Sequence, residues 1–117
     1  MIYCAASFAG AMLEIIARLP FPRGPASHCS VFCEVADDGI ELLAPKAVPD
    51  WDADDRIASQ AFGNAWYDSG RSLALAVPSV IARHDLNVLI NQAHPGFATL
   101  EASVPEPVIW DPRLIGP

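Results

Sequence analysis

The residue types that can do chemistry in this chain are few and widely spaced. Glu14 lies in the run Phe8 to Leu19, and Ser79 directly follows Pro78. Because proline interrupts strand pairing, a serine hydroxyl at that point can leave the sheet and hydrogen-bond a ligand. Glu14 lies off the apolar stripe of its segment, so the pattern alone favours an exposed helix residue, and Ser79 alone is equally consistent with a plain strand-end serine.

Two further polar residues flank a turn, and one aromatic residue ends a strand. Asn91 and His94 lie beside Pro95 and Gly96, where polar side chains often satisfy the turn backbone, so loop fixing is favoured over ligand binding. Tyr3 can stack on a ligand ring and offer its hydroxyl, or pack in the core.

Metal and redox chemistry find little support in the sequence. The acids between Asp50 and Asp55 have no His or Cys at ligand spacing, so a solvated loop before a helix is favoured over a metal site. Cys29 and Cys33 lie in an expected strand, about 13 Å apart along it, too far to share a disulfide. With Cys4 they make an odd number of thiols, which we expect to be reduced, buried and structural.

Length and charge narrow the class of protein. The 117 residues predict one domain, 1–117, and the net charge of −7 makes direct nucleic-acid binding unfavourable. The apolar N-terminus lacks a basic region before it and contains Glu14, which argues against a signal peptide, and the chain has no run long enough to span a membrane. We therefore expect a cytoplasmic protein without a membrane segment.

The elements that would position these residues are short strands and two helices. We expect helices over 8–19, with Ser7 as N-cap, and over 56–68, with Ile57, Ala61 and Trp66 facing inward. Strands are expected over residues 1–5, 29–35, 40–43, 72–77, 80–81, 87–91, 99–104 and 108–110, with a hairpin at Asp37 to Gly39 and a loop from 111 to the end. The pattern favours an α+β (mixed α/β) fold over a doubly wound one.

Several of these segments resemble the RES domain, a family of toxins from bacterial toxin–antitoxin systems. The matching motifs are G-x-x-W from Gly63 to Trp66, V-P-S from Val77 to Ser79, and N-x-L-x-N-x-x-H-P from Asn87 to Pro95. They continue in D-P-R-L from Asp111 to Leu114, and the first strand and helix supply the family's Tyr and Glu as Tyr3 and Glu14. The resemblance covers about residues 1–20 and 62–114.

The resemblance implies a split sheet like that of ADP-ribosyltransferase toxins and cleavage of the nicotinamide–ribose bond of NAD⁺, without a metal. ADP-ribose would pass to phosphate, water or a protein. Glu14 and Ser79 would be the catalytic residues, and Tyr3, Asn91 and His94 would contact NAD⁺. The expected partner is an antitoxin of the Xre helix-turn-helix type, which covers the site.

One departure from the family pattern concerns its first segment. The family carries arginines in an R-x-x-G turn and in a G-R-W-N stretch before the Tyr strand, and this chain begins at that strand. Arg18, Arg23 and Arg71 lie elsewhere, and arginine is the natural partner of a pyrophosphate. We therefore expect a partial RES domain, either from a misassigned start or as an inactive remnant that still binds an antitoxin. A chance resemblance in a small α+β binding domain is the third possibility.

Overall fold

The protein is described by a computed structural model that covers residues 1–19 and 27–115. Its centre is a four-stranded mixed sheet in the order β1-β5-β4-β3, formed by β1 (Ile2–Ala5), β5 (Leu86–Ile90), β4 (Ala74–Pro78) and β3 (Ile40–Leu42). The β1–β5 and β5–β4 pairs are antiparallel and the β4–β3 pair is parallel. The predicted α+β class is confirmed.

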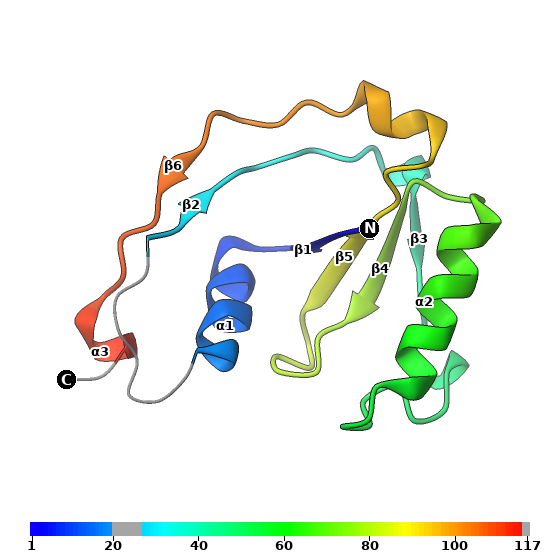
Figure 1. The fold of residues 1–117 in the computed structure, drawn as a ribbon, viewed down its shortest axis with the longest axis horizontal. Helices are drawn as coiled ribbons and strands as arrows, with labels where there is room; N and C mark the ends of the chain where they lie inside the picture. Colours follow the sequence, from blue (N-terminus) through cyan, green and yellow to red (C-terminus); the bar gives the residue numbers. More distant parts are fainter. Residues whose placement is uncertain (20–26, 116–117) are drawn as a thin grey trace.

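Helix α2 (Ile57–Ser69) lies alongside the sheet, and the core forms between them (Figure 1). Trp66, which is 1% exposed, packs with Leu75 of β4 and Leu89 of β5. The indole Nε1 of Trp66 donates to Ser72 Oγ at 2.7 Å, so the one polar atom of the ring is satisfied inside the core. The helix ends at Gly70, whose positive φ of 61° suits glycine.

Helix α1 (Phe8–Arg18) begins directly after β1. Ser7 caps it as predicted, because its side chain accepts from the Gly10 amide. Gly10 is buried, and a Cβ added there would lie 3.0 Å from Ser7 Oγ and 3.5 Å from Ala5 Cβ. The glycine therefore lets the first turn of α1 approach the end of β1 closely.

The remaining segments form an arm beside the sheet. Strand β2 (Cys29–Ser30) pairs antiparallel with β6 (Glu106–Pro107), and the isolated bridge between Cys33 and Ala102 extends the contact. Figure 1 shows these two segments running together past β1, with the short helix α3 (Pro112–Ile115) beyond β6. Within the described residues, 3₁₀ turns lie at Asp37–Gly39, Pro45–Ala47 and Pro95–Thr99.

Several sequence predictions of strands are wrong. The Asp37–Gly39 turn does not close a hairpin, because β2 pairs with β6 while β3 pairs in parallel with β4. Most of 29–35 and 99–104 lies outside the named strands, residues 108–110 form none, and residues 80–81 belong to the turn between β4 and β5. The tail predicted as loop contains α3. Long-range pairing decides these short segments, since their local sequence fits strand or loop equally well.

The inward face of α2 also differs in part from its prediction. Trp66 faces the core, but Ile57 is 70% exposed and Ala61 is also exposed. Phe62 packs against the core cluster instead, one turn before Trp66. The expected burial of all three thiols is wrong as well, because Cys29 and Cys33 are exposed and Cys4 is half-buried.

Candidate functional site

The side chains of Glu14 and Ser79 meet directly. Ser79 Oγ donates a hydrogen bond of 3.1 Å to Glu14 Oε1. Asn87 Nδ2 donates to the same oxygen at 2.9 Å. A carboxylate from α1 is therefore held by a hydroxyl that follows β4 and by an amide from β5. Two residues that act on one bond must lie close together, so this contact agrees with the resemblance, while their catalytic roles stay predictions.

Strand register explains why these side chains converge. Asn87 pairs with Ala5 of β1 on one side and with Val77 of β4 on the other, so it lies on an inner strand of the sheet. Because side chains alternate along a strand, Asn87 shares its face with Val77 and, one step further along the chain, with Ser79. Glu14 reaches this face from the second turn of α1, which starts beside the same strand ends.

Ser79 is fully engaged by its surroundings. It is 4% exposed, and its hydroxyl oxygen accepts from the amides of Ile81 at 3.2 Å and Ala82 at 3.1 Å while its proton points to Glu14. A hydroxyl has one proton and two acceptor positions, and all three are used here. Ser79 therefore shapes the turn after β4 and orients the carboxylate.

The turn between β4 and β5 also contacts the acid-rich loop before α2. Arg83 Nη1 donates to Asp52 Oδ2 at 2.7 Å, and the guanidinium lies 5.7 Å from the centre of the Trp51 ring. The hydrogen bond from Arg83 holds the pKa of Asp52 below its usual value. The acid-rich loop thus anchors the turn that carries Ser79, which is a structural use of one of its carboxylates.

Glu14 presents a second oxygen that these bonds leave open. Both donors use Oε1, and within 1–19 and 27–115 no hydrogen bond to Oε2 is formed. Glu14 is half-buried rather than exposed, so the expectation from the helix pattern alone is wrong. A carboxylate fixed through one oxygen can offer the other to a positive centre in a ligand.

Tyr3 lies on the same face of the sheet as Asn87. It pairs with Leu89 across β1 and β5, two residues along from the Ala5–Asn87 pair. Its side chain is 72% exposed, so the alternative that it packs in the core is wrong.

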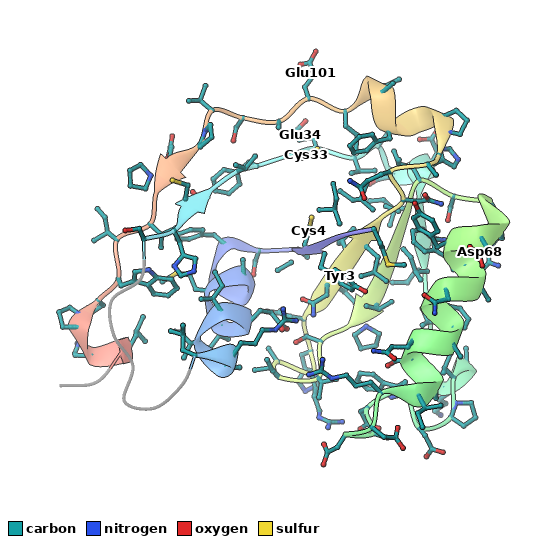
Figure 2. The ribbon with its side chains drawn as sticks, in the orientation of Figure 1. Tyr3, Cys4, Cys33, Glu34, Asp68 and Glu101 are labelled. Carbon is teal, nitrogen blue, oxygen red and sulfur yellow. The ribbon has the colours of Figure 1, made fainter. Side chains whose placement is uncertain are left out.

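Figure 2 shows Tyr3 and Cys4 leaving β1 on opposite sides, with Cys4 directed toward the segment that carries Cys33. Burial, and secondarily the charge of Cys33, raises the pKa of Cys4.

Asn91 and His94 are not brought together with Glu14. Asn91 follows the opposite end of β5 from Asn87, a distance of about 13 Å along a strand. It is 1% exposed, donates to the Tyr67 carbonyl at 3.0 Å and accepts from the Ala93 amide at 2.9 Å. Both ends of the side chain therefore hold the loop against the end of α2.

His94 caps the 3₁₀ turn that follows it. Its Nδ1 accepts from the Gly96 amide at 2.9 Å, so a neutral ring carries its proton on Nε2. The ring lines a hollow of about 380 Å³ with Leu73, Asp38 and Glu34, and a second hollow of about 490 Å³ lies near Cys33. Glu14 lines neither of these two hollows. The candidate site around Glu14 is therefore identified from the hydrogen bonds of its carboxylate and not from a cavity.

The described residues contain no cluster of His, Cys, Asp and Glu suited to a metal ion. No helix among them is long and apolar enough to cross a membrane.

The arginines that could contact a pyrophosphate are placed differently. Arg71 pairs with Glu41 at 2.7 Å, and Arg23 lies outside the described residues. Arg18 lies one turn after Glu14 on α1 and forms no ion pair with the rest of the described chain.

The fold and the held carboxylate define a small α+β domain with a candidate polar site where α1 meets the sheet. Comparison with known proteins then identifies it: residues 1–111 match the RES domain, and the chain belongs to that family. The match is continuous and includes the middle of the chain, where the sequence motifs gave no support.

Three relatives cover nearly the whole chain. The "Prs ADP-ribosylating toxin" of Sphingobium sp. (strain YBL2) is 36% identical over 98% of this chain and 74% of its own length. A "Toxin Res" of Yersinia enterocolitica is 36% identical over 97% of this chain and 76% of its own. A "Toxin Res" of Pseudomonas putida is 32% identical, with 97% and 79% covered.

Asn87 is the site residue that the motif interpretation missed. It belongs to the N-x-L-x-N-x-x-H-P motif, in which the resemblance assigns a ligand contact only to Asn91 and His94. The available signal was the alternation of side chains along the strand, which places Asn87 on the same face as the apolar Leu89. A polar residue on the core-facing side of a strand needs a hydrogen-bond partner.

Proposed function

We propose that this protein cleaves the bond between nicotinamide and ribose in NAD⁺ and that Glu14 is its catalytic carboxylate. The observation that carries the proposal is the hydrogen bond of Ser79 to Glu14, which joins the Glu and Ser positions of the family resemblance in one contact. The name of the Sphingobium relative supports the reaction class, since transfer of ADP-ribose begins with loss of nicotinamide.

The chemistry requires a fixed negative charge near the reacting carbon. When the bond from ribose C1′ to the nicotinamide nitrogen breaks, nicotinamide leaves with the electron pair and positive charge develops on the ribose. Glu14 Oε2 would stabilise this charge, because its carboxylate is already oriented and needs no reorganisation. An acceptor oxygen then bonds to C1′ and gives up its proton. Phosphate, water and a protein side chain all remain open as acceptors.

The other predicted contacts fit the proposal unequally. Tyr3 offers an exposed ring on the face that holds Asn87, where it would stack on the nicotinamide or adenine ring. Ser79 contributes through Glu14 rather than by touching NAD⁺. For Asn91 and His94 the hydrogen bonds favour the loop-fixing role, and a contact of either with NAD⁺ would be to a part remote from Glu14.

We further propose that the protein is a cytoplasmic toxin held inactive by a protein partner of the Xre helix-turn-helix type. The toxin names of the relatives support this role. The partner would cover the face that carries Tyr3 and Glu14. Co-expression with a small neighbouring reading frame should yield one complex on gel filtration, and two independent species would count against the partner.

A second candidate is a partial domain, 1–117, that binds the partner without turning over NAD⁺. The net charge of −7 supports it, because a pyrophosphate needs cations and Arg18 is the free arginine near Glu14 among the described residues. The DNA upstream of the first codon separates the two candidates. An in-frame G-R-W-N and R-x-x-G would favour the enzyme, and stop codons would favour the partner-binding remnant.

The test of the proposed function is product analysis. NAD⁺ is incubated with the 117-residue chain, and with an upstream-extended chain if the frame is open, in the presence and absence of phosphate. Chromatography should show free nicotinamide together with an ADP-ribose product whose identity depends on the acceptor. Absence of nicotinamide from every incubation would contradict the proposal.

A further inference from the structure

The open question at the candidate site is what keeps the Glu14 carboxylate in one orientation. A glutamate side chain has three rotatable bonds, and a single hydrogen bond leaves the carboxyl group free to swing about it. In this protein the carboxylate has two donors, Ser79 Oγ and Asn87 Nδ2, and both use the same oxygen. One donor comes from the turn after β4 and the other from β5, so together they fix a direction as well as a distance.

We infer that Asn87 is a positioning residue for the Glu14 carboxylate, holding Oε1 so that Oε2 faces the reacting ribose of NAD⁺. The inference rests on the proposed function and adds to it a residue that acts through Glu14 and does not touch substrate.

The location of Asn87 suits this role. It lies on β5, one of the two inner strands of this sheet, between Ala5 of β1 and Val77 of β4. A side chain based on a central strand is held more rigidly than one on a loop, so its amide gives a fixed reference point. Ser79 by contrast follows the last residue of β4, and its oxygen also serves the turn amides.

A purely structural tie between α1 and the sheet is the competing explanation. The two roles predict opposite orders for two substitutions. Asn87→Asp keeps the shape of the side chain but replaces the donor with a second carboxylate about 3 Å from Glu14, which repels it. Asn87→Ala removes the donor without adding charge. If Asn87 positions the carboxylate, Asn87→Asp should lower turnover more than Asn87→Ala. If Asn87 only packs, Asn87→Ala should lower turnover more, because it removes more of the side chain.

The two roles also differ in the kinetic constant that changes. A carboxylate that stabilises charge in the transition state affects kcat, while binding of NAD⁺ in the ground state is little altered. Loss of one hydrogen bond to a charged group corresponds to a drop of about ten- to a hundredfold. We therefore expect kcat to fall by that factor for Asn87→Ala and further for Asn87→Asp, with KM for NAD⁺ within about threefold of the parent.

The experiment measures nicotinamide release by the parent, Glu14→Gln, Asn87→Ala and Asn87→Asp, with exposed Asn64→Ala of α2 as the matched control. Circular dichroism and thermal unfolding confirm that each variant is folded, and the side-chain amide signal of Asn87 in a ¹H–¹⁵N spectrum should shift in Glu14→Gln. The expected result is the order parent, Asn87→Ala, Asn87→Asp in falling kcat, with Asn64→Ala at the parent value.

Each other outcome has a definite meaning. If Glu14→Gln abolishes release while both Asn87 variants stay within twofold of the parent, or change KM alone, the inference is overturned and the proposed function stands. The inference is also overturned if Asn87→Ala is the slower variant, because packing then explains the effect. Absence of release from the parent overturns the proposed function and the positioning role together.

Discussion

Replacement of Ser79 by alanine should destabilise the fold more than any ordinary surface substitution. The hydroxyl of Ser79 accepts from two backbone amides, of Ile81 and Ala82, and donates to Glu14, and the residue is 4% exposed. Each neutral hydrogen bond contributes about 0.5–1.5 kcal/mol, and a bond to a charged group about 1.5–3 kcal/mol. Because these bonds lie in a turn that water reaches in part, we expect a combined loss of about 2–3 kcal/mol in the free energy of unfolding.

The assay is urea unfolding followed by tryptophan fluorescence, which reports on the buried Trp66. Ser30→Ala is the control, because Ser30 Oγ makes a single exposed bond of 3.4 Å to the Glu106 carbonyl and its loss should cost under about 0.5 kcal/mol. In a Glu14→Ala background the cost of Ser79→Ala should fall by about 1 kcal/mol, since one of its three bonds is already absent. Equal urea midpoints for Ser79→Ala and Ser30→Ala would show that the three hydrogen bonds of Ser79 do not stabilise the fold.

Two further predictions concern groups outside the candidate site. Cys29 and Cys33 are exposed, whereas burial raises the pKa of Cys4, so iodoacetamide should label the first two thiols faster than Cys4, and mass spectrometry showing Cys4 labelled first would contradict the structure. Arg71 donates two hydrogen bonds to Glu41, which lower the pKa of that carboxyl below its ordinary value of 4.5. The stabilisation is therefore present above pH 4.5 and lost as the pH falls through the lowered pKa, so urea midpoints of the parent and Arg71→Gln should differ slightly at neutral pH and converge in acid. A difference that grows in acid would contradict this assignment.

Local sequence was sufficient for elements with a clear periodicity or cap. Helix α1 begins after its Ser7 cap as predicted, and Trp66 points into the core. Strand β4 was predicted over 72–77 and lies at Ala74–Pro78, so its end is placed to within one residue by the proline. In each case a strong local preference agrees with the tertiary environment.

Segments whose partners are distant in the chain could not be assigned from local sequence. Strand β3 follows Asp37–Gly39 and looked like half of a hairpin, but it pairs in parallel with β4, beyond α2 in sequence. Strand β2 similarly finds β6 rather than its neighbour. Pairing over such separations depends on the whole sheet, which a short pattern does not contain.

In the candidate site, too, some features could be predicted from the sequence and others depend on how the strands pair. The family resemblance makes Glu14 and Ser79 the catalytic pair, and the two side chains are in contact. The contact of Asn87 with Glu14 could be predicted only from the register of β5 against β1 and β4, because register decides which face of the sheet a side chain occupies. Asn91 and His94 share a motif with Asn87, yet the direction of β5 carries them to its opposite end.

We propose that the Glu14 carboxylate, held by its Oε1, stabilises the ribose cation formed when nicotinamide leaves NAD⁺. The most direct test of this proposal is the rate of nicotinamide release by the folded parent and by Glu14→Gln, which keeps the size of the side chain and removes its charge. Loss of the negative charge in Glu14→Gln should lower kcat by about a hundredfold or more. Equal rates for the two proteins would contradict it.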